Sequence, residues 1–160
     1  MQRLVQDLLD VSTIDADRLF INQEQVDLPE LISELHTIVS PQLKARRARM
    51  EIRLAPDLPT VMLDRHRILQ VLLNLIGNAL KFGTHGSLVT LGAERQEDAI
   101  RIWVEDTGDG IRFEELPRVF DRFWRAGHGA GAGLGLALAK GIVEAPVSYT
   151  HLTLPTIYSV

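Results

Sequence analysis

Apolar residues recur at three- and four-residue steps in several segments, which is the spacing typical of amphipathic helices. The first segment runs from Met1 to about Asp17 and begins in mid-pattern without a capping residue, so we expect this helix to continue upstream in a longer parent protein. A second pattern opens at Pro29, a residue that suits the first turn of a helix. The longest runs from Asp64 to Phe82, with apolar Ile68, Val71, Leu72, Leu75, Ile76 and Ala79. Another apolar helix is predicted over residues 134–143.

Strict alternation of apolar and polar residues predicts the strands. Residues 50–54 alternate as a half-buried strand would, and residues 25–28 predict a short strand. Residues 89–93 and 100–104 flank a polar turn and predict an antiparallel hairpin. Because helices and strands come in mixed order, we expect an α+β fold with helices on one face of a mostly antiparallel sheet.

The composition limits the size of the core and the class of partner. With 160 residues, 46% of them hydrophobic, the chain can build one core, or one domain with an appended helix. Its 17 Lys and Arg against 21 Asp and Glu give a net charge of −4, so no nucleic-acid partner is expected. The chain has no cysteine, which excludes disulfides and thiolate metal sites and suits a reducing cytoplasm. No apolar run approaches the roughly 20 residues of a transmembrane helix. We expect a cytoplasmic domain.

A polar stripe follows the predicted helix 64–82 on the side opposite its apolar face. Its members recur at three- and four-residue steps and are Arg67, Gln70, Asn74, Asn78 and Lys81. Asparagine is a poor helix former that offers both donor and acceptor groups, so two of them one turn apart favour a ligand site. Taken alone, the stripe is explained equally well as a solvated face.

A glycine-containing turn, Asp106–Ile111, comes directly after the second strand of the predicted hairpin. Its glycines let the backbone approach a bound group closely, and the Asp106 carboxylate could accept a hydrogen bond from an amino group. An ordinary turn or a fragment of a metal-binding loop explains the same residues when they are considered alone.

A glycine-rich run, Gly127–Leu136, leads into the last predicted helix. Such a junction presents free backbone N–H groups and a positive helix end to a phosphate. A flexible linker is the main alternative. A dinucleotide-binding turn is a weaker one, because such a turn follows a core strand and no strand is predicted directly before this run. A short helical pattern is predicted around residues 116–123, and it overlaps the segment Phe120–Arg125. The aromatic residues of this segment could pack a lid, and its arginines could bind a polyphosphate. A short surface helix with buried aromatics explains the same residues equally well.

Four segments, taken in order, resemble the N, G1, F and G2 boxes of sensor histidine kinases. They are Asn74–Phe82, Asp106–Ile111, Phe120–Arg125 and Gly131–Leu136. Sensor histidine kinases belong to a wider superfamily shared with gyrase, the Hsp90 chaperones and MutL. The resemblance implies a Bergerat-type ATP-binding fold, an α/β sandwich, and a protein histidine kinase activity.

The resemblance also divides the chain. Residues 1–22 resemble the end of the second dimerisation helix and its linker, and residues 23–145 resemble the catalytic domain, without its last strands. Residues 146–160 contain no Asp, Glu, Lys or Arg and resemble one reading frame of a transposase-based sequencing adapter. We therefore expect this tail to be non-native.

Roles for single residues follow from the resemblance. It implies that Asn78 helps hold Mg²⁺ against the phosphates of ATP, supported by Asn74 and Lys81. Asp106 would bind the adenine amino group, with Gly108 and Gly110 leaving room for the base. The lid hinge and phosphate cradle would comprise Gly131, Gly133, Gly135 and Leu136. Arg122 or Arg125 would stabilise charge on the transferring phosphoryl group.

Asn74 separates the kinases from their hydrolytic relatives, which resemble one another in carrying a glutamate there as general base. An amide cannot accept that proton, so transfer to a histidine is favoured over hydrolysis. In kinases of this type the acceptor histidine lies in a segment like His-Glu-Leu-Arg-Thr-Pro, and none of the five histidines of this chain does. The acceptor is therefore expected on a dimerisation domain outside this chain. The resemblance also implies a homodimeric parent and a response regulator that acts downstream of it. The alternatives are a non-catalytic ATP-binding or dimerisation module and a hydrolytic ATPase of the superfamily.

Overall fold

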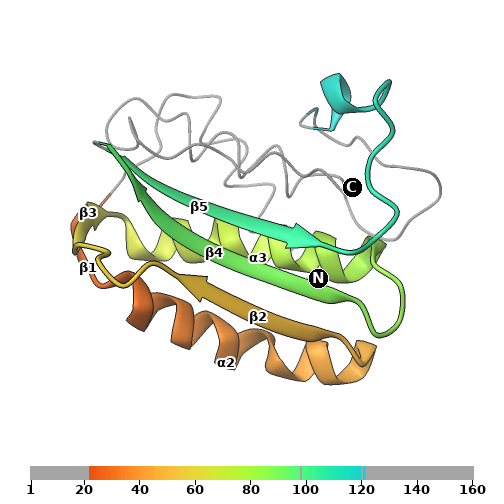
Figure 1. Ribbon diagram of the computed structural model, residues 1–160, viewed down its shortest axis with the longest axis horizontal. Coiled ribbons are helices and arrows are strands. Elements are labelled where there is room, and N and C mark those ends of the chain that lie inside the picture. Colours follow the sequence, from red (N-terminus) through yellow and green to blue (C-terminus); the bar gives the residue numbers. More distant parts are fainter. Residues whose placement is uncertain (1–21, 98, 120, 122–160) are drawn as a thin grey trace.

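The computed structural model describes residues 22–97, 99–119 and 121. Its elements, in chain order, are β1 (Glu24–Val26), α2 (Leu28–Arg46), β2 (Arg49–Leu54), β3 (Val61–Leu63), α3 (Arg65–Phe82), β4 (Leu88–Gln96), β5 (Ala99–Asp106) and the short 3-10 helix η1 (Leu116–Arg118) (Figure 1). The predicted helices over residues 1–17 and 134–143 and the tail over 146–160 lie outside the described residues. No helix within the described ranges is both long and apolar enough to cross a membrane.

Each long helix begins at an aspartate that caps it. Asp27 Oδ1 accepts a hydrogen bond from the Glu30 N–H (2.9 Å), so α2 starts one residue before the predicted Pro29. Asp64 Oδ1 accepts from the Arg67 N–H (3.0 Å) and caps α3. The carboxylate of Asp64 is buried, and its Oδ2 accepts from the Asn22 N–H (2.9 Å), which ties the start of α3 to the chain before β1.

The strands form two small sheets. β1 pairs with β3 in antiparallel register, and β4 lies between β2 and β5 in a three-stranded sheet. The predicted hairpin is confirmed, because β4 and β5 are antiparallel from Gln96–Ala99 to Val89–Asp106. The expected mostly antiparallel pairing is confirmed, and the structure adds one parallel pairing, of β2 with β4. Parallel neighbours need a crossover, here the segment containing β3 and α3, and alternation within one strand carries no information on direction.

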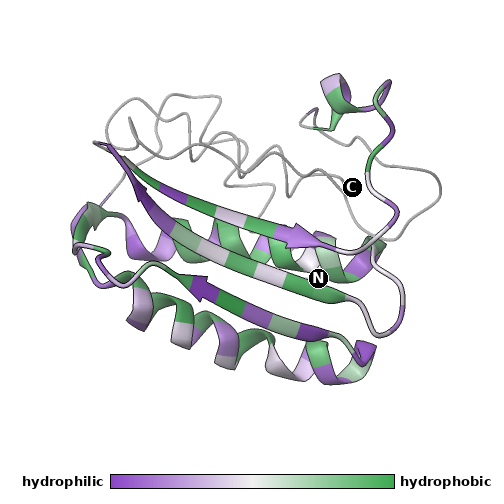
Figure 2. Ribbon diagram, in the orientation of Figure 1, coloured by the Kyte–Doolittle hydropathy of each residue, from purple (hydrophilic) through white to green (hydrophobic). Residues whose placement is uncertain are grey.

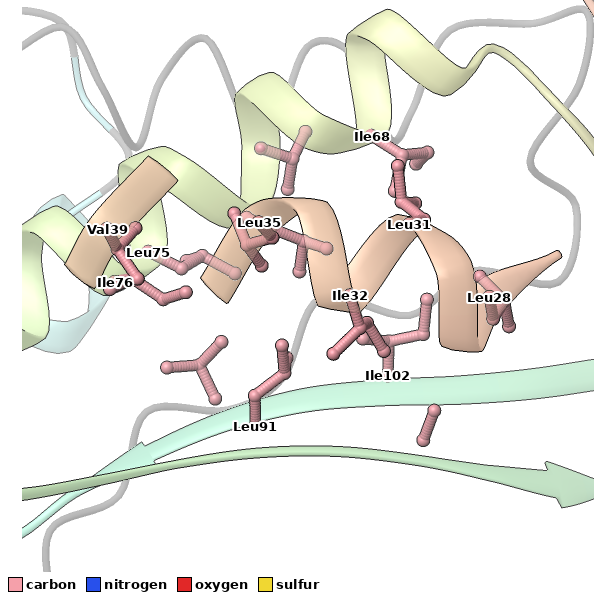
Figure 3. Close-up of a cluster of buried hydrophobic side chains, with 14 of the residues drawn as sticks. Leu28, Leu31, Ile32, Leu35, Val39, Ile68, Leu75, Ile76, Leu91 and Ile102 are labelled. Atoms are coloured by element: carbon pink, nitrogen blue, oxygen red, sulfur yellow. The ribbon is translucent and has the colours of Figure 1, made fainter. Parts of the chain in front are cut away.

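The hydrophobic core lies between the two helices and one face of the sheet. Figure 3 shows side chains of α2 and α3, among them Leu35 and Ile76, directed towards Leu91 of β4 and Ile102 of β5. These four side chains are at most 2% exposed. Burial of a large apolar side chain contributes about 1.5–3 kcal/mol, so this layer supplies most of the stabilisation of the described fold. The expected arrangement of helices on one face of the sheet is therefore confirmed.

Strand β2 is only partly covered because it forms one edge of the three-stranded sheet. Ile52 faces the same side as Leu91 in the β2–β4 register, yet it remains 40% exposed. The alternation of hydrophilic and hydrophobic residues along β2 and β5 is visible in Figure 2. On the other face of the sheet the Trp103 indole lies against Gly92, in space that a Cβ would occupy, and the Arg101 guanidinium lies 5.6 Å from the Trp103 ring centroid.

Candidate functional site

The polar stripe predicted from the sequence lies on α3, opposite its buried face. Ile68, Val71, Leu72, Leu75, Ile76, Ala79 and Leu80 are buried, whereas Asn74, Asn78 and Lys81 are only half-buried. Three- and four-residue steps place these polar side chains next to one another on the helix surface. The stripe is thus accessible enough to meet a ligand.

Gly77 lies in the middle of this polar face, three residues after Asn74 and four before Lys81. A Cβ built on Gly77 meets no described atom within 4 Å. Among the described residues, the space directly beside Gly77 is therefore open.

The turn after β5 is shaped by a hydrogen bond to the Asp106 carboxylate and by a glycine with positive φ. Asp106 is the last residue of β5 and is half-buried. Its Oδ1 accepts a short hydrogen bond from the Gly108 N–H (2.7 Å), which fixes the orientation of the carboxylate. Gly110 has φ 74°, a left-handed conformation that favours glycine. One oxygen of Asp106 is thus held by the loop, and Oδ2 has no hydrogen bond to any described residue.

The turn and the helix meet at the C-terminal end of α3. A Cβ built on Gly108 would lie 3.3 Å from both the Gly83 Cα and the Phe82 carbonyl oxygen, and 2.7 Å from Asp106 Oδ1. A side chain at position 108 would therefore require the Asp106 carboxylate and the end of α3 to shift, which glycine avoids. The structure brings Asp106 and Gly108 next to the end of the helix that carries Asn78 and Lys81.

Sequence reasoning did not single out two residues that support this contact. Thr107 continues the ladder beyond Asp106, because its N–H donates to the Leu88 carbonyl (3.2 Å) and its Oγ1 accepts from the Leu88 N–H (3.1 Å). Gly83 ends α3, and its N–H donates to the Ala79 carbonyl (2.9 Å). A hydroxyl residue between a strand and a glycine turn is the signal that could have identified Thr107.

The segment after Gly110 is held by a local ion pair. Arg112 donates to Glu115 Oε1 (2.9 Å), and this hydrogen bond raises the pKa of the Arg112 guanidinium. Both residues are close to the turn in sequence, and because the Arg112 side chain is 79% exposed, this ion pair contributes little to stability.

The donor set on α3 fits Mg²⁺ bound together with a polyphosphate. The described residues contain no group of three His, Cys, Asp or Glu that could hold a metal ion by themselves. Mg²⁺ usually keeps several waters and binds one or two protein oxygens plus substrate phosphates. The amide oxygen of Asn78, half-buried beside Asn74, suits that role.

The remaining predicted site residues lie outside the described ranges. They are Arg122, Arg125, Gly131, Gly133, Gly135 and Leu136. The roles expected for them, in the lid, the phosphate cradle and phosphoryl transfer, stay predictions. The described part of the site therefore comprises the Asp106 turn and the polar face of α3.

Comparison with known proteins agrees with this geometry. Residues 63–154 match the model of the family described as histidine kinase-, DNA gyrase B-, and HSP90-like ATPase. The sensory/regulatory protein RpfC of Xanthomonas campestris pv. campestris is 40% identical over 153 residues, covering 89% of this chain and 21% of RpfC. The chain thus spans about a fifth of the length of that relative.

Two solved structures have the same fold. Full-length ShkA in complex with AMPPNP superposes with a TM-score of 0.82 at 30% identity, over 89% of this chain and 30% of ShkA. The nucleotide-free catalytic domain of the histidine kinase ThkA gives a TM-score of 0.71 at 26% identity, over 77% and 80% of the two chains. The resemblance inferred from the four boxes is therefore confirmed. The chain belongs to the family of histidine kinase-, DNA gyrase B-, and HSP90-like ATPases, and its relatives are sensor histidine kinases.

Proposed function

We propose that this chain binds Mg-ATP as the catalytic domain of a sensor histidine kinase and donates the γ-phosphoryl group to a histidine on a dimerisation domain. The observation that carries the proposal is the contact of Gly108 with the end of α3. It brings the turn that carries the half-buried Asp106 carboxylate against the C-terminal end of the helix that carries Asn78, which supports a single nucleotide site. AMPPNP, an ATP analogue, is bound in the ShkA structure, which supports ATP as the ligand.

Each part of the described site has a role in this proposal. Asp106 Oδ2 accepts a hydrogen bond from the adenine amino group, because Oδ1 is already occupied by the Gly108 N–H. Asn78 holds Mg²⁺, and Lys81 places a positive charge near the phosphates. Bound Mg²⁺ would supply neutralisation of the phosphate charge.

Phosphoryl transfer then requires positioning more than covalent chemistry from this chain. An unprotonated imidazole nitrogen of the acceptor attacks the γ-phosphorus. The bond from that phosphorus to the bridging oxygen breaks, and ADP leaves with the electron pair. Arg122 or Arg125 is proposed to stabilise the charge that develops on the phosphoryl oxygens.

Asn74 favours transfer over hydrolysis. A hydrolytic enzyme needs a base at this position to take a proton from water, and the amide of Asn74 cannot accept one at neutral pH. We propose that the acceptor dimerisation domain belongs to the same homodimeric parent, that a response regulator receives the phosphoryl group, and that the domain works where ATP is available, in the cytoplasm.

Titration calorimetry of the full chain with Mg-ATP tests nucleotide binding. Asp106→Asn and Asn78→Ala should each weaken binding by about tenfold or more, since each removes a charged or metal-mediated contact. Glu105→Gln, an exposed carboxylate next to Asp106, and Gln42→Ala, an exposed amide on α2, are matched controls that should bind normally. Absence of binding by folded chain would contradict the proposal.

Phosphotransfer is tested separately, by adding a dimerisation domain that bears the acceptor histidine and following phosphohistidine. Transfer from ATP would support the kinase proposal. Binding without transfer would instead favour a regulatory ATP-binding module. Appreciable turnover of ATP without any acceptor would point to a hydrolytic ATPase.

A further inference from the structure

The β4–β5 ladder ends on a side chain. Its last paired residues are Val89 and Asp106. One step further, Thr107 donates its N–H to the Leu88 carbonyl, but the Leu88 N–H donates to Thr107 Oγ1. In a continuing antiparallel pair, the Thr107 carbonyl would accept that bond. The hydroxyl takes the place of the carbonyl, so the chain leaves the sheet directly after Thr107 without leaving the Leu88 N–H unpaired.

The partner of this hydroxyl is firmly held. Leu88 begins β4, the middle strand of the sheet, and is paired with Arg49 of β2 on its other side. The Arg49 N–H also donates to the Ser87 carbonyl (2.9 Å). The Thr107 hydroxyl therefore fastens the turn to a strand that is bonded on both sides.

The turn that follows determines where the Asp106 carboxylate lies. Gly108 donates to Asp106 Oδ1 and rests on the end of α3 at Gly83. Both contacts follow directly after Thr107, whose N–H and hydroxyl are both bonded to Leu88. We propose that Thr107 is a positioning residue, which fixes the Asp106 carboxylate for recognition of the base. This inference rests on the proposed ATP-binding function.

The consequence is a loss of base discrimination. Adenine offers an exocyclic amino donor to Asp106, whereas guanine carries a carbonyl oxygen at the same position. A carboxylate that is held in place accepts a hydrogen bond from the adenine amino group, but it has no donor to bind opposite the guanine carbonyl. A loosened turn reduces the advantage of ATP over GTP, whereas a general loss of stability lowers both affinities alike.

The test compares Thr107→Val, which keeps the shape and removes the hydroxyl, with Thr107→Ser, which keeps the hydroxyl. In the full chain, Thr107→Val should weaken ATP binding about fivefold, the effect of one hydrogen bond, and should lower the ratio of ATP to GTP affinity. Thr107→Ser should restore both. Thr60→Val is the control, since the Thr60 hydroxyl accepts from Gln25 Nε2 (3.3 Å) directly before β3, far from the end of β5 (Figure 1).

Amide hydrogen exchange at Leu88 gives a readout that needs no nucleotide. Exchange should be faster in Thr107→Val than in the unsubstituted chain and normal in Thr107→Ser. An unchanged ATP-to-GTP ratio in Thr107→Val, or equal losses in the valine and serine variants, would overturn the inference while leaving ATP binding intact. If the unsubstituted chain bound neither nucleotide, the proposed function and this inference would fail together.

Discussion

The core between the helices and the sheet and the turn after β5 are held by different kinds of contact. In the core, side chains such as Leu35 and Leu91 are fully buried among apolar neighbours, so the stabilisation is distributed over many contacts. In the turn, Asp106, Thr107 and Gly108 are fixed by a few hydrogen bonds and one close backbone approach. Fold stability and site geometry therefore depend on separate residues, so substitutions should separate the two properties.

Leu35→Ala should have the largest effect, and on stability alone. Leu35 is 0% exposed, and truncation leaves a cavity, so the free energy of unfolding should fall by about 3 kcal/mol. Chemical denaturation measures this. Ile38→Ala, on the same helix but 41% exposed, should cost much less. Equal losses in the two variants would show that the helix does not depend on its buried face.

Asp64→Ala should cause the next largest loss in the free energy of unfolding, because polar contacts of Asp64 also stabilise the fold. The buried carboxylate caps α3 and binds the Asn22 N–H, so its loss should cost about 2 kcal/mol. The matched variant is Asp27→Ala, at the exposed cap of α2, which should cost about 1 kcal/mol. Thermal unfolding of both variants compares them, and a smaller loss for Asp64→Ala would contradict the role of its second bond.

Gly108→Ala should affect the site more than the fold. Its new methyl group would press on Asp106 Oδ1 and on the end of α3, so Mg-ATP affinity should fall about tenfold, as measured by calorimetry. Stability should change by less than about 1 kcal/mol. Asp109→Ala, an exposed neighbour in the same turn, is the control that should bind normally. Normal binding by Gly108→Ala would mean that the turn adapts.

The smallest effect is expected on the outer face of β2, away from both regions. Arg53 Nε donates to Glu51 Oε1 (2.8 Å), which lowers the pKa of the Glu51 carboxyl. A lowered folded-state pKa gives stability that is present above the ordinary glutamate pKa and lost as the pH falls through the folded-state value. Stability of the unsubstituted chain relative to Glu51→Gln should therefore decline slightly below about pH 4.5, because the pair is exposed and screened. An increase on acidification would contradict this sign.

Local sequence predicted much of the fold. The helix predicted from Asp64 to Phe82 is α3, and the alternation at 89–93 and 100–104 is the β4–β5 hairpin. These predictions hold because the helical and strand periods depend only on residues that are close together in the sequence. The resemblance to the kinase boxes, rather than local patterns, implied that Asp106 and Asn78 belong to one site. They lie on β5 and α3, which are in contact, and their roles stay predictions.

The tertiary structure decided what local patterns cannot encode. Parallel pairing of β2 with β4, the contact of Gly108 with Gly83, and the Trp103 indole over Gly92 each join residues that are distant in sequence. The Thr107 hydroxyl acquires its role only because the hairpin register brings Leu88 opposite to it. The sequence by itself determined the two long helices, the β4–β5 hairpin and the family, since periodicity and ordered motifs are local. Which residues hold the site in place was decided by packing and register, because those contacts exist only once the elements are assembled.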